Sequence, residues 1–387
     1  MTAEFQSKLN RFQLASLVIG ILALGASVFG VFTNPRQFFF SYLFAILFWL
    51  SLSLGCFAVM MIHHLTGGRW GYPTRRFLEA GFMVLPLMAV LFIPIFFGLH
   101  YLYPWAQPGD AASNKISHAY ENQWAYIIRQ IFFFFVWIWM AARLRKWSLA
   151  QDVTADAAPT RKARALSGPG LVIYGLLVTF ASVDWIVSLE KDWYSTMFGV
   201  IVAGGQILTA YAFSVVALTL FQKQEPFKAT VNKVHYHHLG NLLLTFVLFW
   251  TYVSFGQLLI IYSGDLPQEL EWYLHRIAGS WKAVVAAVGL FHFFVPFFLL
   301  LFRGFKKRVT ALTILAALIF VMHIVDTYWL VMPTLHQGGV ALSWLDFTAP
   351  IGVGGLWMSY FLRLLKAAPL LPQNDPGMQF AFVYVKP

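Results

Sequence analysis

The sequence predicts an all-α polytopic membrane protein that forms a single integral membrane domain over residues 1–387. Of the 387 residues, 59% are hydrophobic and 11% are charged, whereas about 25% of the residues in soluble globular proteins are charged. The apolar residues form runs of about 20, the length that a membrane-spanning helix requires. The net charge of +11 is typical of basic loops at a membrane surface, so nucleic acid is not an expected partner.

Ten apolar segments have the length of a membrane span. They are residues 14–32, 38–62, 80–102, 124–142, 169–189, 196–221, 239–262, 278–302, 309–332 and 343–365. Asn34-Pro35 separates the first two segments, and Pro86, Pro94 and Pro296 predict kinks inside later ones. Residues 1–10 are polar and mixed in charge, so we expect the first segment to be a retained span and not a cleaved signal peptide.

The basic residues predict how the spans are oriented. With ten spans, the two termini and the even-numbered loops lie on one side of the membrane. That side carries 21 of the 27 Lys and Arg residues. The other six are Arg36, Lys115, Arg129, Lys191, Arg276 and Lys282. Because cytoplasmic loops are enriched in Lys and Arg, both termini are predicted to be cytoplasmic.

Two intramembrane aspartates suggest an internal duplication. Asp184 and Asp326 lie at similar depths in the fifth and ninth spans, and the fourth and eighth spans carry similar phenylalanine-rich stretches at 132–136 and 291–295. The sequence therefore predicts two four-helix bundles, spans 2–5 (38–189) and spans 6–9 (196–332), with two peripheral helices.

Ionisable residues at membrane depth are candidates for function because they are costly to bury. Arg129 and Lys282 enter the fourth and eighth spans, so Asp184 and Asp326 either form ion pairs with such cations or act as a proton relay or quinol site.

Several histidines and one glutamate extend this candidate proton path. His323 and Asp326 are three residues apart and share a helix face, and His292 lies near the middle of the preceding span. His292 and His323 are also an alternative pair of haem b ligands. His64 and Glu79, at the predicted cytoplasmic side, are candidates for proton uptake. The single cysteine, Cys56, excludes an iron–sulfur cluster held by this chain alone.

Seven segments of the chain carry a resemblance to a known family: residues 64–71, 75–80, 182–199, 249–257, 264–273, 326–329 and 371–376. These segments resemble the NrfD-like, polysulfide-reductase-type membrane subunits of bacterial alternative complex III, and in particular the shorter of the two subunits of that kind. They occur in one order and extend from the second span to the C-terminus.

The resemblance implies a subunit of a quinol:electron-acceptor oxidoreductase in the bacterial inner (cytoplasmic) membrane. Its implied partners are a multihaem cytochrome c subunit, a periplasmic iron–sulfur subunit, a second NrfD-like subunit, small membrane-anchor subunits and lipid. Haem c and the iron–sulfur clusters would belong to those partners. This chain would bind no cofactor alone, although a quinone is possible, and it is expected to hold no metal and no catalytic redox residue.

Our leading hypothesis is that the chain supports quinol oxidation and conducts protons through His64, Glu79, Asp184, Lys282, His292, His323 and Asp326. His100 and Asp184 are the candidates for contact with a quinone. Two alternatives from other functional classes are a secondary transporter with rocking bundles and a purely structural membrane anchor whose charges pair with one another.

Overall fold

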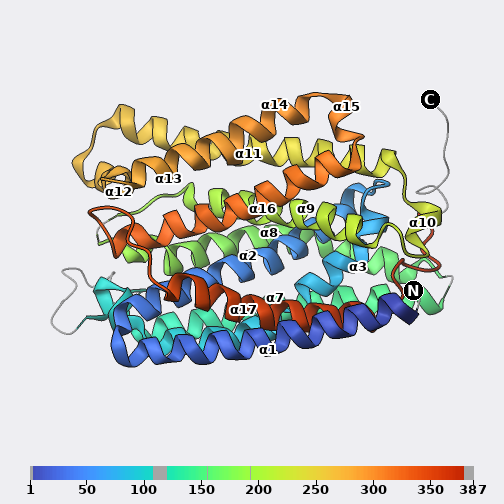
Figure 1. The fold of residues 1–387 in the computed structure, drawn as a ribbon, viewed down its shortest axis with the longest axis horizontal. Coiled ribbons are helices and arrows are strands. Elements are labelled where there is room, and N and C mark those ends of the chain that lie inside the picture. Colours follow the sequence, from blue (N-terminus) through green and yellow to red (C-terminus); the bar gives the residue numbers. More distant parts are fainter. Residues whose placement is uncertain (1–2, 108–119, 155, 192, 379–387) are drawn as a thin grey trace.

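The computed structural model describes residues 3–107, 120–154, 156–191 and 193–378, and all regular structure in these ranges is helical. Most helices run side by side along the longest axis of the molecule (Figure 1). The N-terminal half contains α1 (Ala3–Thr33), α2 (Pro35–Thr66), α3 (Gly71–Phe82), α4 (Leu85–Phe92), η1 (Ile93–Phe97), α5 (Leu99–Leu102), η2 (Pro104–Ala106), α7 (Gln123–Val153), α8 (Ala158–Trp185) and η3 (Val187–Leu189). The C-terminal half contains α9 (Phe198–Phe221), α10 (Phe227–Thr230), α11 (Lys233–Gly264), α12 (Pro267–Ile277), α13 (Trp281–Ala287), η4 (Val288–Phe294), α14 (Val295–Leu301), α15 (Arg303–Lys306), α16 (Val309–Val331), η5 (Met332–Thr334) and α17 (Leu345–Lys366).

Within the described ranges, nine helical segments are long and apolar enough to cross a membrane. They are Glu4–Thr33, Pro35–Thr66, Gly71–Phe97, Gln123–Val153, Ala158–Leu189, Phe198–Phe221, Lys233–Gly264, Trp281–Leu301 and Val309–Thr334. The chain is therefore a polytopic helical membrane protein, as the composition predicted. The tenth predicted span forms the helix α17, which is not among these nine segments.

Polar caps explain where several long helices begin. The Asn34 side chain accepts a hydrogen bond from the backbone N–H of Gln37 and is followed by Pro35 at the first helical position, a combination that favours a helix start. Asn122 and Asn232 cap α7 and α11 in the same way. The predicted break between the first two spans is thus confirmed at the residue that the sequence indicated.

Two predicted spans are interrupted close to their prolines. The third is divided into α3, α4, η1 and α5, with Pro86 in the first turn of α4 and Pro94 in η1. It also begins earlier than predicted, at Gly71 and not near residue 80. The eighth contains a π-helical segment, η4, directly before Pro296. A proline removes one backbone hydrogen bond and disturbs the turn before it, and π-helical turns are frequent at functional sites.

Helix α2 forms the buried centre and packs against α3, α8, α9 and α17, whereas α1 is mostly exposed and lies along α17. At the crossing of α2 and α9, Gly55 lies directly against the backbone of Gln206. Small residues allow such close backbone approach between membrane helices. Because α2 and α9 belong to different predicted bundles, their contact joins the two halves, and the division into two four-helix bundles remains a prediction.

Candidate functional site

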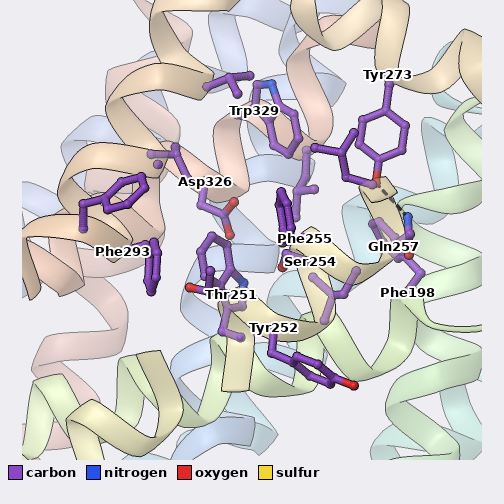
Figure 2. A pocket seen from close by; sticks show the side chains of 18 of the residues that line it. Phe198, Thr251, Tyr252, Ser254, Phe255, Gln257, Tyr273, Phe293, Asp326 and Trp329 are labelled. Atoms are coloured by element: carbon purple, nitrogen blue, oxygen red, sulfur yellow. Dashed lines mark hydrogen bonds between the residues drawn. The ribbon is translucent and has the colours of Figure 1, made fainter. Parts of the chain in front are cut away.

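A cavity lies between α11, η4 and α16, with α9 and α12 closing its ends. Its volume is about 530 Å³, within the range of sites that hold small organic ligands. Most of the wall is aromatic or aliphatic, and the polar exceptions are few (Figure 2). The lining residues are Phe198, Ile201, Leu248, Trp250, Thr251, Tyr252, Ser254, Phe255, Gln257, Leu258, Trp272, Tyr273, Val285, Val288, Gly289, Phe293, Phe294, Asp326, Trp329 and Leu330.

The mouth of this cavity opens on the side of the helix array. Tyr252 and Phe255 on α11 are 77% and 59% exposed, and Phe294 on η4 is 50% exposed. These residues lie within segments that are long and apolar enough to cross a membrane. Exposed apolar side chains of this kind suit contact with the acyl chains of lipids or with another protein.

Among the described residues that line the cavity, Asp326 is the one carboxylate. It projects from α16, is 4% exposed, and its carboxylate points toward the cavity (Figure 2). Among the described residues, its ion-pair contact is with Nδ1 of His323 at 3.8 Å, a distance longer than a hydrogen bond. Asp326 therefore lacks the strong cationic partner that usually compensates a buried carboxylate.

Two histidines lie behind Asp326. Nε2 of His323 is 3.0 Å from the hydroxyl of Ser51 on α2. His292, on the π-helical segment, has its ring 6.2 Å from that of His323 and 4.6 Å from that of Trp250. Both ring nitrogens of His292 and Nδ1 of His323 are buried without a hydrogen-bond partner. These nitrogens are available to accept or donate a proton.

A smaller chamber of about 30 Å³ connects these groups to the interior of the helix array. Ser51, Gln206, His323 and Asp326 all line it. A polar space needs about 10–15 Å³ to hold a water molecule, so this chamber has room for water between Asp326 and His323. On its far side Gln206 accepts a hydrogen bond from the hydroxyl of Tyr174 at 2.7 Å.

Further polar groups of the cavity come from one face of α11. The hydroxyls of Thr251 and Ser254 are buried without partners, and Gln257 donates to the phenol oxygen of Tyr273 at 3.2 Å (Figure 2). Burial raises the pKa of Tyr273 to about 12, so this phenol is neutral at physiological pH. These positions lie in the segment 249–257 that carries the resemblance but were not candidates for function, although Thr251, Ser254 and Gln257 are spaced three residues apart and so share a helix face.

The end of the cavity is closed by α12 and the segment that follows η3. Trp193 stacks on Trp272, with ring centroids 4.7 Å apart. Arg276 lies over the Trp272 ring and contacts Glu190 at 3.0 Å. Burial lowers the pKa of Arg276 to about 10, which still leaves the guanidinium charged at neutral pH. Asp192, in the same segment, lies outside the described residues.

Asp184 has a different environment from Asp326. Arg129 contacts both of its carboxylate oxygens, and Gln130 donates to Oδ2 at 2.7 Å. Of the two alternatives for Asp184, the structure thus shows the ion pair with Arg129. His100 is exposed and lies against Tyr101, so none of the hydrogen bonds to Asp184 comes from it.

Glu79 lies at the centre of a buried ion-pair cluster. Arg75, Arg76 and Arg145 contact its carboxylate at 3.1, 2.6 and 2.5 Å, and Ser148 also donates to it. Arg75 also binds Asp375 at 2.6 Å and Arg76 binds Asp152, which fixes the segment after α17 to α3 and α7. Three guanidinium groups stabilise the ionised form of a carboxylate, so this arrangement favours a structural role for Glu79 over proton uptake.

The other predicted positions are separate from these groups. His64 is held through Nδ1 by the hydroxyl of Ser167 at 2.9 Å, and its Nε2 is buried without a partner. Lys282 is exposed and forms no salt bridge with Asp326, so the predicted second aspartate–cation pair is wrong. Lys115 lies outside the described residues. Of the seven predicted proton-path residues, the structure brings together three: His292, His323 and Asp326.

In comparisons with known proteins, no family model matches this chain, and no curated protein matches it closely enough to indicate a relative. The evidence for function therefore comes from the geometry and chemistry of the site itself.

Proposed function

We propose that this chain is the integral membrane subunit of a quinol:electron-acceptor oxidoreductase and that quinol binds in the cavity beside Asp326. The observation that supports this proposal best is the combination of an apolar, aromatic cavity that opens on the side of the helix array with one buried, weakly paired carboxylate. A quinol carries an aromatic ring, an apolar tail and two hydroxyl groups, and each part finds a matching feature in this cavity. We therefore propose Asp326 as the residue that contacts the quinone, in place of His100 and Asp184, the two candidates from the sequence.

The side chains around Asp326 suit the removal of protons. Oxidation of a quinol to a quinone releases two protons and two electrons. The Asp326 carboxylate accepts the first proton from a ring hydroxyl and passes it to His323 through water in the small chamber. Asp326 is then free to accept the second proton, while Ser51 orients His323 through its ring nitrogen.

The electrons leave through partner subunits. The resemblance to alternative complex III supplies the partners: a multihaem cytochrome c, a periplasmic iron–sulfur protein, a second NrfD-like subunit and small anchors. In the proposed arrangement the complex lies in the bacterial inner membrane with both termini of this chain in the cytoplasm. The start of α1, α10 and α15, which belong to the predicted cytoplasmic side, lie at one end of the helix array (Figure 1).

The proposal is tested on the complex purified in mild detergent from its native membrane. Asp326→Asn is expected to lower the rate of quinol oxidation about 100-fold, the scale of a lost general base. Glu271→Gln is the matched control, because this carboxylate is 65% exposed on α12 and should leave the rate unchanged. Equal rates for Asp326→Asn and the wild type would overturn the assignment.

Quinone binding and the subunit composition of the purified complex test the proposal independently of the rate. Trp250, Trp272 and Trp329 line the cavity, so a quinone should quench tryptophan fluorescence saturably. Asp326→Asn should weaken this binding less than it lowers the rate.

Mass spectrometry of the purified sample should find a multihaem cytochrome and an iron–sulfur protein, and its absorption spectrum should show haem c bands. A colourless chain isolated alone in full yield would contradict the proposed complex.

A transporter of lipophilic cations is the second candidate. A buried carboxylate surrounded by aromatic rings also suits a cationic amphiphile, and an opening on the side of the helix array would admit such compounds from the bilayer. Saturable quenching by an aromatic cation such as tetraphenylphosphonium, with no quenching by quinones, would favour this candidate over the quinol site.

A further inference from the structure

A group of basic side chains lies where α11 begins and where α14 passes through α15 into α16. Arg303, Lys306 and Lys307 are close enough to His237 for their charges to act on its ring, and Arg69 acts on His238 in the same way. No acidic residue occurs in residues 226–264 or 281–325. The group therefore creates a local positive potential that these helices do not compensate.

Lys306 is the most informative member of this group. It is 6% exposed, and its aliphatic carbons lie against Gly240 of α11. The four buried arginines of the described chain, Arg75, Arg76, Arg145 and Arg276, each contact a carboxylate. Lys306 forms no salt bridge within the described ranges. A lysine whose aliphatic stem is buried and whose ammonium group has no carboxylate partner among the described residues is suited to bind an external anion.

The position of the group identifies the class of anion. The basic residues follow directly on the last residue of one membrane-spanning segment, Leu301, and precede the first residue of the next, Val309. Lipid headgroups occupy this level of a bilayer. Phe298, Leu301 and Phe302 are 55%, 51% and 66% exposed beside the basic residues, so they offer an apolar surface to the acyl chains of the same lipid.

We propose that this surface is a binding site for an anionic phospholipid. The lipid phosphate would contact Lys306 and Arg303, with His237 beside it, and the acyl chains would lie along α14. Basic pockets between membrane helices bind anionic headgroups on the cytoplasmic side, the side to which the proposed topology assigns these loops. The site is independent of the quinol cavity and does not depend on the proposed function.

The test measures lipid retention by native mass spectrometry of the protein with its partners. The sample is exchanged into detergent that contains equal amounts of phosphatidylglycerol and phosphatidylcholine with identical acyl chains. The wild type should retain phosphatidylglycerol preferentially. Lys306→Met keeps the aliphatic contact with Gly240 but removes the charge, and it should lower that preference about fivefold, the scale of one basic residue near a charged membrane surface.

Two further variants serve as a second test of the site and as a control. Arg303→Gln changes an exposed residue, and it should produce a loss similar to that of Lys306→Met. Lys228→Met, an exposed lysine of α10, is the matched control and should retain the wild-type preference. Equal retention of both lipids by the wild type, or an unchanged preference in Lys306→Met and Arg303→Gln, would overturn the proposal. Displacement of the lipid by millimolar inorganic phosphate would overturn it as well, because it would identify a site for soluble phosphate.

Discussion

Arg129 contacts both carboxylate oxygens of Asp184, with Nη2 2.8 Å from Oδ1 and Nε 3.0 Å from Oδ2. Asp326, at a similar depth in the ninth predicted span, has no arginine or lysine partner among the described residues. The two aspartates therefore differ in chemistry: one is neutralised by an ion pair, whereas the other faces a cavity and retains the capacity to bind a proton.

This difference predicts that the Arg129–Asp184 pair is structural. Arg129→Gln leaves Asp184 buried without its cation and should lower the free energy of unfolding by about 3–5 kcal/mol. Thermal unfolding of the purified protein measures the effect. Because Arg129→Gln combined with Asp184→Asn removes both charges, the double variant should recover much of the loss. A double variant less stable than Arg129→Gln alone would contradict the structural role.

Gly289 offers a way to block the cavity without disturbing the fold. A side chain at this position meets open space, and the residue lines the cavity wall. Gly289→Leu should therefore keep the melting temperature but raise the KM for quinol about tenfold or more, which corresponds to a loss of about 1.4 kcal/mol in binding. Gly175→Leu is the control, because Gly175 on α8 also faces open space; similar KM values for the two variants would exclude the cavity as the quinol site.

The crossing of α2 and α9 should not tolerate a larger residue. A Cβ atom on Gly55 would overlap the backbone carbonyl of Gln206, so Gly55→Ala forces the helices apart and should cost about 1–3 kcal/mol. Gly25→Ala on α1, where nothing lies within 4 Å, should instead be neutral or slightly stabilising because alanine favours helix. Thermal unfolding of both variants makes the comparison, and equal melting temperatures would contradict the close approach.

The segment after α17 should depend on Asp375 for its order. Asp375 accepts a hydrogen bond from Arg75 at 2.6 Å, and its neighbours Gln373 and Asn374 bind Asp152. Asp375→Asn removes one charged partner, a loss of about 1.5–3 kcal/mol, and should increase hydrogen–deuterium exchange in residues 371–378. Exchange in α2 should remain unchanged, and unaltered exchange in both regions would show that the ion pair does not hold the segment.

The sequence was sufficient to predict features that depend on local composition. Long apolar runs predicted the nine segments that are long and apolar enough to cross a membrane, and Asn34-Pro35 predicted a helix boundary. The cost of isolated charges in a membrane made the pairing of Arg129 with Asp184 one of two alternatives. These features require no knowledge of how distant helices are rotated.

Features that depend on helix rotation and on distant contacts were not predictable. Lys282 lies just before a π-helical segment, and the sequence gives no indication that its side chain is exposed and away from Asp326. Glu79 was a candidate for proton uptake. Arg75 and Arg76 precede it at helical spacing, but Arg145 and Asp375, which complete the ion-pair cluster, lie far from it along the chain. The cavity likewise arises from the separation of α11 and η4, which no single segment encodes.

The cavity opens at the side of the helix array, between Tyr252, Phe255 and Phe294. The position of this opening affects how a ligand would be supplied to the cavity. A compound that reaches Asp326 from the bilayer through this opening is supplied by diffusion in two dimensions, and its relevant concentration is its mole fraction in the lipid. Diluting the membranes with buffer would leave occupancy unchanged, whereas adding lipid without substrate would lower it. Saturation curves for this protein therefore have physical meaning only when the lipid-to-protein ratio is held constant.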